Sequence, residues 1–510
     1  MKRCRGQITV FMALSALSLF SLFCVCLEGA RSACLDYLCS QAADSALRSV
    51  FAAYQGETLR DYGLLMSRGR EFGSSTLERD VEHYAEKYLS PAVNTFQSRG
   101  DRVRMRALEA SAKEAVYMTD GRGAVYSQAV LDYMKTSGLS LLLQEVLGRL
   151  GLYSEAEGGG LLETIQGMIL DKDSSLEGIL GSYQDIKEQA AALQEEARLK
   201  AEEEEREYEA PPGSSEDVKT DLLEQIKSIW KSGLIAVITG SESLSDYSWN
   251  QYDLPSRLPE EEKTRHLEYG QLPVNLTDRL LIGEYLQYKM NCYTEPADTG
   301  SRYETEYVLT GRKTDKGALE QVVGELLLIR MGFNLAYLST DAEKVAMAEL
   351  TAIAIMSFLA LPQLVLVLKW VLLSAWALAE SIVDLRGLVR GKKIPLWKTK
   401  QSWRLSSMKL DLSAEGGSDK RGLSYEDYLR ILFPLGNPSD QAYRMMDVMQ
   451  ARLRQERPEL AVKDYLVQAL VSLKATAAYL YVDAPLIRDL MNRPSARQYT
   501  RDAFYAYGRR

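Results

Sequence analysis

The sequence predicts an α+β protein with an N-terminal transmembrane helix that continues into a long amphipathic helix. A helix-rich extracytoplasmic body with small mixed sheets is expected to follow. Three observations support this: an uncharged apolar run near the N-terminus, long segments with apolar residues at helical spacing, and short alternating segments. The 510 residues are 46% hydrophobic and 26% charged, which suits a folded chain of two to four domains.

The apolar run covers residues 7–27 and carries no charge. As a helix it would span about 31 Å, close to the ~30 Å hydrocarbon core of a bilayer. The lipid-facing anchor is expected to include Gln7, Phe11, Leu17, Leu19 and Leu27. Lys2, Arg3 and Arg5 precede the run, so the positive-inside rule places the N-terminus in the cytoplasm and the body outside. We therefore expect a single-pass protein of the cell membrane.

The helical pattern continues beyond the expected bilayer. Residues 28–51 contain no proline, and Leu35, Leu38 and Ala42 begin an apolar stripe at helical spacing. A helix with such a stripe must pack against the body or against another subunit. We therefore expect Leu35, Leu38 and Ala42 to serve helix packing and assembly.

Composition divides the chain into four parts. They are a cytoplasmic stub and transmembrane anchor (1–27), a first extracytoplasmic α+β region (28–182), a charged helical arm and linker (183–217), and a second extracytoplasmic α+β domain (218–510). The arm contains an acidic run at 202–205 and ends at a Pro-Pro-Gly sequence, which is typical of an exposed helix or short coiled coil.

Several shorter elements follow from periodicity. Helices are expected at 77–90, 222–236 and 443–453 and before Pro434, and strands at 103–117, 303–310 and 477–482. In the 303–310 strand, alternation would place Glu304 and Glu306 on a solvated face. General acid–base chemistry is the other interpretation of these paired carboxylates.

The apolar segment at 346–383 has two interpretations. Residues 350–368 are uncharged and long enough to cross a bilayer, and a basic cluster follows them, which suits a cytoplasmic exit. However, Pro362 interrupts the run, and Lys369 is followed by a further apolar stretch at 370–379. We therefore favour a buried apolar helical hairpin within the second domain.

No motif in the sequence assigns chemistry. The chain has two histidines, His83 and His266, in unrelated contexts, and it lacks the usual hydrolase, metalloprotease and dinucleotide-binding motifs. No catalytic, cofactor-binding or metal-binding residue is therefore assigned, and no cofactor is expected. The net charge of −9 argues against nucleic acid as a partner.

Short segments carry a family resemblance. The sequences RGQITVF (5–11), EGAR (28–31) and QAADSA (41–46) resemble the start of TadE/TadG-type proteins, membrane-anchored components of the Tad (Flp) pilus assembly system, and indicate a pilin-type N-terminus. Phe11 stands where processed Tad pseudopilins carry a glutamate, so an uncleaved TadG-like anchor is the better interpretation than cleavage after Gly6.

Downstream segments resemble a second, uncharacterised group. YETEYVLTG (303–311), LLIR (327–330), WALAE (376–380) and RMMD (444–447) are similar to a membrane-anchored family of anaerobic Gram-positive bacteria associated with Tad-like pilus loci. The resemblance implies a location and a system but no activity.

We therefore expect a non-enzymatic extracytoplasmic accessory or scaffold protein of a Tad-like pilus or surface assembly system. Its expected partners are the lipid bilayer and other pilus-assembly or envelope proteins. The alternative is an extracellular carboxylate-dependent enzyme acting on cell-wall polymer or peptide, since the chain has 70 acidic residues.

Overall fold

The computed structural model describes residues 4–68, 76–90, 105–137, 155–170, 176–203, 226–228, 233–240, 244–250, 253–269, 271–298, 300–406, 419, 422–478 and 496–507. The chain forms two compact units. The first draws on residues 1–133, 257–271 and 453–510, and the second on 134–256 and 272–452. These units do not follow the boundaries expected from composition, because the C-terminal strands belong to the same unit as the N-terminal helix.

The first unit contains the long N-terminal helix and a β-sheet. Its main elements are α1 (Cys4–Ala52), α2 (Gly56–Tyr62), β1 (Ser67–Arg68), α3 (Leu77–Leu89), β2 (Arg106–Tyr117), α4 (Ala124–Thr136, whose last residues fall in the second unit), α10 (Glu260–Lys263), β3 (Tyr465–Ala478) and β4 (Ala496–Ala506). The expected long helix, the helix at 77–90 and a strand within 103–117 are confirmed as α1, α3 and β2.

The sheet is antiparallel, with β3 between β2 and β4 and with the short β1 also paired to β3. In the register, Leu473 of β3 lies opposite Ala110 of β2 and Arg501 of β4. The expectation of mixed sheets is therefore wrong for the described residues. The strand expected at 477–482 overlaps β3 only at Ala477 and Ala478, since β3 begins at Tyr465, and residues 479–482 lie outside the described part of the chain.

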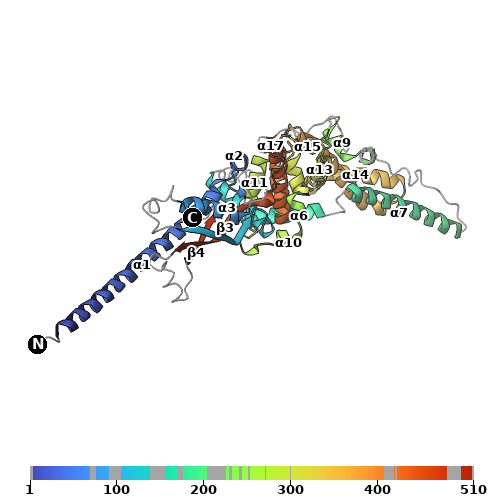
Figure 1. Cartoon of the computed structure of the whole chain (residues 1–510). Coiled ribbons are helices and arrows are strands. Elements are labelled where there is room, and N and C mark those ends of the chain that lie inside the picture. Colours follow the sequence, from blue (N-terminus) through green and yellow to red (C-terminus); the bar gives the residue numbers. More distant parts are fainter. Residues whose placement is uncertain are drawn as a thin grey trace. The chain divides into compact units, whose positions relative to one another are not determined.

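Alternation along β3 produces the core of this unit. Ala469, Val471, Leu473, Ala475 and Ala477 are buried at every second position and pack with α1 and α3. The small alanine side chains let the second half of α1 lie close to the sheet. Figure 1 shows the first half of α1 extending beyond β3 and β4.

The second unit is helical. Its main elements are α6 (Glu155–Leu170), α7 (Leu176–Glu203), α9 (Leu234–Thr239), α11 (Leu276–Lys289), α12 (Glu304–Thr310), α13 (Asp315–Thr340), α14 (Ala342–Phe358), α15 (Val365–Val389), α16 (Tyr425–Leu432) and α17 (Pro438–Glu456, whose last residues fall in the first unit). The helix expected before Pro434 is confirmed as α16, and the one at 443–453 lies within α17. The charged arm is a helix, α7, and residues 204–217 lie outside the described part. The single helix expected at 222–236 is wrong: residues 226–228 are helical, but Gly233 has a positive φ (85°) and α9 begins separately at Leu234, while the other residues before Gly233 lie outside the described part.

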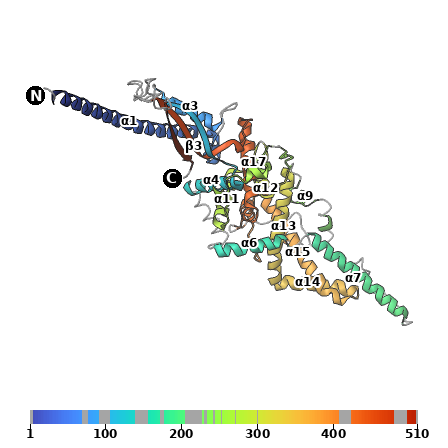
Figure 2. The ribbon, with the colours of Figure 1, turned by 60° about the horizontal axis from the view of Figure 1, so that its bottom comes forward.

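Helices α13 and α15 form the centre of this unit, with α14 joined to α15 by a tight bend (Figure 2). Side chains fix the helix starts: Thr314 Oγ1 accepts a hydrogen bond from the Gly317 amide, and Ser424 and Asp427 form a capping box on α16. The Thr314 cap, together with Gly311, separates α12 from α13.

The prediction of a strand at 303–310 is wrong, because this segment forms the helix α12. The two glutamates are buried together with Tyr303 and Tyr307, so the sequence pattern does not report one solvated face. Gly311 follows in the left-handed conformation (φ 69°) and ends the helix. Glu304 and Glu306 therefore do not lie on a solvated surface.

The apolar segment at 346–383 does form a helical hairpin, made from α14 and α15. The uncharged run 350–368 is thus bent and is not one continuous helix. However, the end of the hairpin is exposed, so the expectation of a buried hairpin holds only for its base. By length and composition, the helical stretches of the described residues able to cross a membrane are Ile8–Ala52, Asp315–Thr340 and Pro362–Val389.

Candidate functional site

The first half of α1 has the properties of a membrane anchor. Its most apolar window has a mean hydropathy of 2.4 and is wholly unburied, whereas the corresponding windows of the other two candidates are 56% and 67% buried. Phe11 and Leu17 are 70% and 66% exposed, and Leu19 and Leu27 are also exposed. The side chain of Gln7 lies outside the described part. This half of α1 therefore presents apolar side chains on all sides, as a helix in lipid does.

The second half of α1 packs on the protein itself. Leu35, Leu38 and Ala42 are buried, and Leu35 and Ala42 belong to the core that α1 shares with β3 and β4. The stripe expected to serve packing or assembly is thus covered by the first unit's own sheet. Tyr37 lies on the opposite, exposed side of the helix.

Polar contacts hold α1 to the strands at the point where it emerges from the sheet. The Arg31 guanidinium donates to the Ala478 carbonyl at 2.6 Å and to Glu28 Oε1 at 3.0 Å. Asp36 forms an ion pair with Arg501 of β4. The exposed apolar half of α1 and the folded sheet are therefore joined by one continuous helix and not by a linker.

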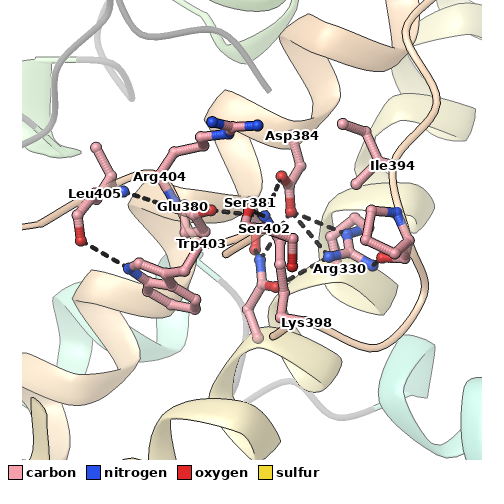
Figure 3. A network of polar contacts seen from close by, with 12 residues as sticks. Arg330, Glu380, Ser381, Asp384, Ile394, Lys398, Ser402, Trp403, Arg404 and Leu405 are labelled. Atoms are coloured by element: carbon pink, nitrogen blue, oxygen red, sulfur yellow. Dashed lines mark hydrogen bonds and ion pairs between the residues drawn. The ribbon is translucent and has the colours of Figure 1, made fainter. Parts of the chain in front are cut away.

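A second feature is a charged network buried between α13, α15 and the segment that follows α15 (Figure 3). Lys398 Nζ lies 2.6 Å from Glu380 Oε1 and 2.7 Å from Asp384 Oδ1, and Arg330 Nη2 lies 2.9 Å from Asp384 Oδ2. The side chains of these four residues are at most 1% exposed. Two cations therefore balance two carboxylates away from solvent.

The side chains of this network also form hydrogen bonds with backbone groups of the segment that follows α15. Glu380 accepts hydrogen bonds from the amides of Arg404 and Leu405, both at 2.9 Å. Arg330 donates to the carbonyls of Pro395 and Leu396 at 3.0 and 2.9 Å. The network therefore fixes the segment 394–405 against α13 and α15, because these side-chain contacts engage its backbone groups.

Burial raises the pKa of Glu380, an effect that the charge of Lys398 opposes. A balanced and hydrogen-bonded arrangement of this kind fixes packing and offers no open position to a substrate. We therefore assign the network a structural role.

A second buried cluster surrounds α12. Glu304 forms an ion pair with Arg452, with Nε 2.6 Å from Oε1, and accepts a hydrogen bond from the Asn291 amide at 2.9 Å. Burial raises the pKa of Glu304, and the Arg452 charge opposes that shift. This carboxylate holds α12 to α17 and to the chain after α11.

Glu306 is fully buried in the same cluster. Its Oε1 accepts hydrogen bonds from the Tyr293 amide and the Tyr425 hydroxyl, both at 2.9 Å, while its Oε2 has no hydrogen-bond partner. Burial raises the pKa of Glu306 to about 7. The neighbouring Cys292 is also buried, and burial raises the pKa of its thiol to about 12, so this thiol is not activated as a nucleophile.

Sequence reasoning named the Glu304 and Glu306 pair but did not single out the buried network of Arg330, Glu380, Asp384 and Lys398. A signal was present in α15, where Glu380 and Asp384 stand four residues apart within the most apolar part of the helix. Two of the segments quoted above, LLIR and WALAE, end on network residues Arg330 and Glu380. Within the described residues, no group of three or more histidine, cysteine, aspartate or glutamate side chains is placed to hold a metal ion.

These features define an α+β protein whose long, apolar N-terminal helix is compatible with a single membrane anchor. The chain belongs to a family of unknown function, DUF5702, whose model matches residues 212–477, just over half of the chain. No curated protein and no solved structure matches the chain.

Proposed function

We propose that the chain is an extracytoplasmic accessory or scaffold protein of a Tad-like pilus or surface assembly system. The single observation that carries this proposal is the division of α1 into an exposed apolar half and a half packed on the sheet. A pilin-type N-terminus, which the resemblance to TadE/TadG-type proteins implies, has this division.

The continuity of α1 determines how such a protein would act. Because the helix enters the core of the first unit, this unit is held at a defined position relative to the anchor. The anchor half then presents Phe11, Leu17 and their neighbours to lipid and to the membrane helices of other envelope proteins. With the N-terminus in the cytoplasm, the body lies outside the cell.

The buried carboxylates give little support to the alternative, an extracellular carboxylate-dependent enzyme. Glu304 is paired with Arg452, and Glu306 is enclosed by Tyr293 and Tyr425. Neither is exposed to a substrate in this structure.

Complementation of a deletion strain tests the proposal. We expect deletion to reduce surface-fibre counts, the wild-type gene to restore them, and the double variant Leu17→Arg/Leu19→Arg to fail. The two arginines cost roughly 5–7 kcal/mol of insertion free energy, at about +2.5–3.5 kcal/mol each. The conservative double variant Leu17→Ile/Leu19→Ile is the matched control and should restore the fibres. Unchanged fibre counts after deletion would overturn the proposal.

A further inference from the structure

The end of the α14–α15 hairpin exposes a large apolar surface. Leu350 and Phe358 of α14 and Leu366 and Trp370 of α15 are 67%, 46%, 61% and 48% exposed. No charged residue occurs from 350 to 368, and the exposed polar side chains there, Ser357 and Gln363, are neutral. In the rest of the described second unit, apolar side chains mainly form the core.

Charged residues mark the base of this surface. Lys369 of α15 forms an ion pair with Glu349 of α14, with Nζ and Oε2 3.2 Å apart. This pair lies on both helices at the boundary of the uncharged run, and Trp370 stands beside it. An aromatic residue next to a charged border, with only uncharged residues beyond it, is typical of a segment at a membrane interface.

The backbone amides of Ala360 and Leu361, at the bend between α14 and α15, donate hydrogen bonds to carbonyls at the end of α14. The amide of Leu361 donates to the Met356 carbonyl at 2.8 Å, and the amide of Ala360 donates to the Ser357 carbonyl at 3.1 Å. Ala360 adopts the left-handed conformation (φ 56°) that this helix ending requires, and Pro362, which follows, has no amide proton to satisfy. Such closure matters in lipid, where no water is present to bond exposed amides.

From these observations we infer that the end of the α14–α15 hairpin inserts into one leaflet of a lipid bilayer. The uncharged part of α14, residues 350–358, is about 13 Å long, which is close to one leaflet of a ~30 Å hydrocarbon core and too short to cross it. The inference concerns a different surface from α1 and does not depend on the proposed pilus role.

A cleft adjoins the same surface. It has a volume of about 360 Å³ and lies between α7 and α15, with Leu366, Val367 and Trp370 on one side and Ile179 and Ser182 on the other. Its largely apolar lining suits a lipid acyl chain. From Asp185 onward, the exposed side chains of α7 are mostly charged or polar, so lipid contact is assigned to the hairpin end and this cleft and not to the rest of α7.

Photocrosslinking in the full chain tests the inference. A diazirine-bearing amino acid is placed at Leu366, and the protein is reconstituted in vesicles of phosphatidylethanolamine and phosphatidylglycerol. The same probe at Leu17 is the positive control and at the exposed Lys400 the negative control. After illumination we expect a phospholipid mass adduct at Leu366 and Leu17 but not at Lys400.

A second variant makes the result specific. Leu350→Lys/Ile353→Lys changes exposed side chains, so the helical content should be retained, but it places two charges on the hairpin end. The adduct at Leu366 should then fall roughly tenfold or more, with labelling at Leu17 unchanged. A covalent dimer of the chain at Leu366, the absence of a lipid adduct there while Leu17 is labelled, or undiminished labelling in the lysine variant would each overturn the inference.

Discussion

Lys398 is bound to Glu380 inside the second unit, with Nζ 2.6 Å from Oε1 and with both side chains shielded from solvent. The same ammonium group lies 2.7 Å from Asp384 Oδ1 and donates to the Ser402 carbonyl at 3.0 Å. One cation therefore joins two carboxylates of α15 to the segment that follows this helix. Breaking this contact leaves buried negative charge without its partner.

The first prediction concerns this cation. Lys398→Met should lower the free energy of unfolding by about 3–5 kcal/mol, because Glu380 and Asp384 would remain buried with less compensating charge. Urea denaturation of the detergent-solubilised protein measures the change. The matched control is Lys400→Met, whose side chain is exposed and whose ion pair with Glu343 should be worth little. Equal stability of the two variants would contradict the structural role of the network.

The second prediction concerns pH. Because burial raises the pKa of Glu306 from 4.5 to about 7, the folded state binds this proton more tightly than the unfolded state does. The contribution of Glu306 to stability is therefore present below about pH 4.5 and is lost as the pH rises toward 7. At pH 8, loss of this contribution lowers the free energy of unfolding by about 3 kcal/mol relative to its value in acid.

Glu306→Gln removes this titration while keeping an oxygen to accept the Tyr293 and Tyr425 hydrogen bonds. The variant should resemble the wild type at pH 5 and be more stable than it at pH 8. Unfolding curves recorded at both pH values provide the comparison. A variant that is destabilised equally at the two pH values would show that Glu306 is ionised in the folded protein.

The third prediction concerns Glu304. Glu304→Gln should destabilise the second unit by about 1–3 kcal/mol, because it removes a charge-assisted contact to Arg452 from a buried position. Glu343→Gln, at an exposed position, should change stability by no more than about 0.5 kcal/mol. Thermal unfolding of both variants is the measurement, and a neutral Glu304→Gln would restore the solvated interpretation that the structure contradicts.

The fourth prediction concerns the packed half of α1. Leu35→Ala should cost about 2–5 kcal/mol, because a fully buried leucine in the core with β3 is truncated. Tyr37→Ala, two residues along on the exposed side, should leave stability nearly unchanged. Limited proteolysis of the first unit measures the difference, and equal protection of both variants would contradict docking of α1 on the sheet.

The sequence predicted those parts of the fold that periodicity encodes. The long α1, the apolar hairpin and the buried positions Leu35, Leu38 and Ala42 follow from apolar spacing, which reports the face that a helix buries. The pairing of β3 with β2 could not be predicted, because strands far apart in the chain carry no local signal of their partner.

Two expectations differ from the structure because a local sequence pattern does not report which side chains are buried by tertiary contacts. The alternation at 303–310 favours a half-solvated strand with Glu304 and Glu306 on its exposed face. Glu304 and Glu306 are instead buried by partners supplied from α16 and α17, more than a hundred residues away. Likewise, the exposed end of the hairpin could not be separated from its buried base, since both are equally apolar.

The most direct test of the account is the accessibility of the body at the surface of intact cells. Single cysteines are introduced at Lys113 in the first unit and at Lys400, which follows α15 in the second, in a background whose native cysteines are replaced. With one transmembrane anchor and an extracytoplasmic body, both should react with a membrane-impermeant thiol reagent once the wall is permeabilised. Labelling at Lys113 but not at Lys400 would show that the chain crosses the membrane a second time. Labelling at neither position would place the body in the cytoplasm. Either result would contradict the account.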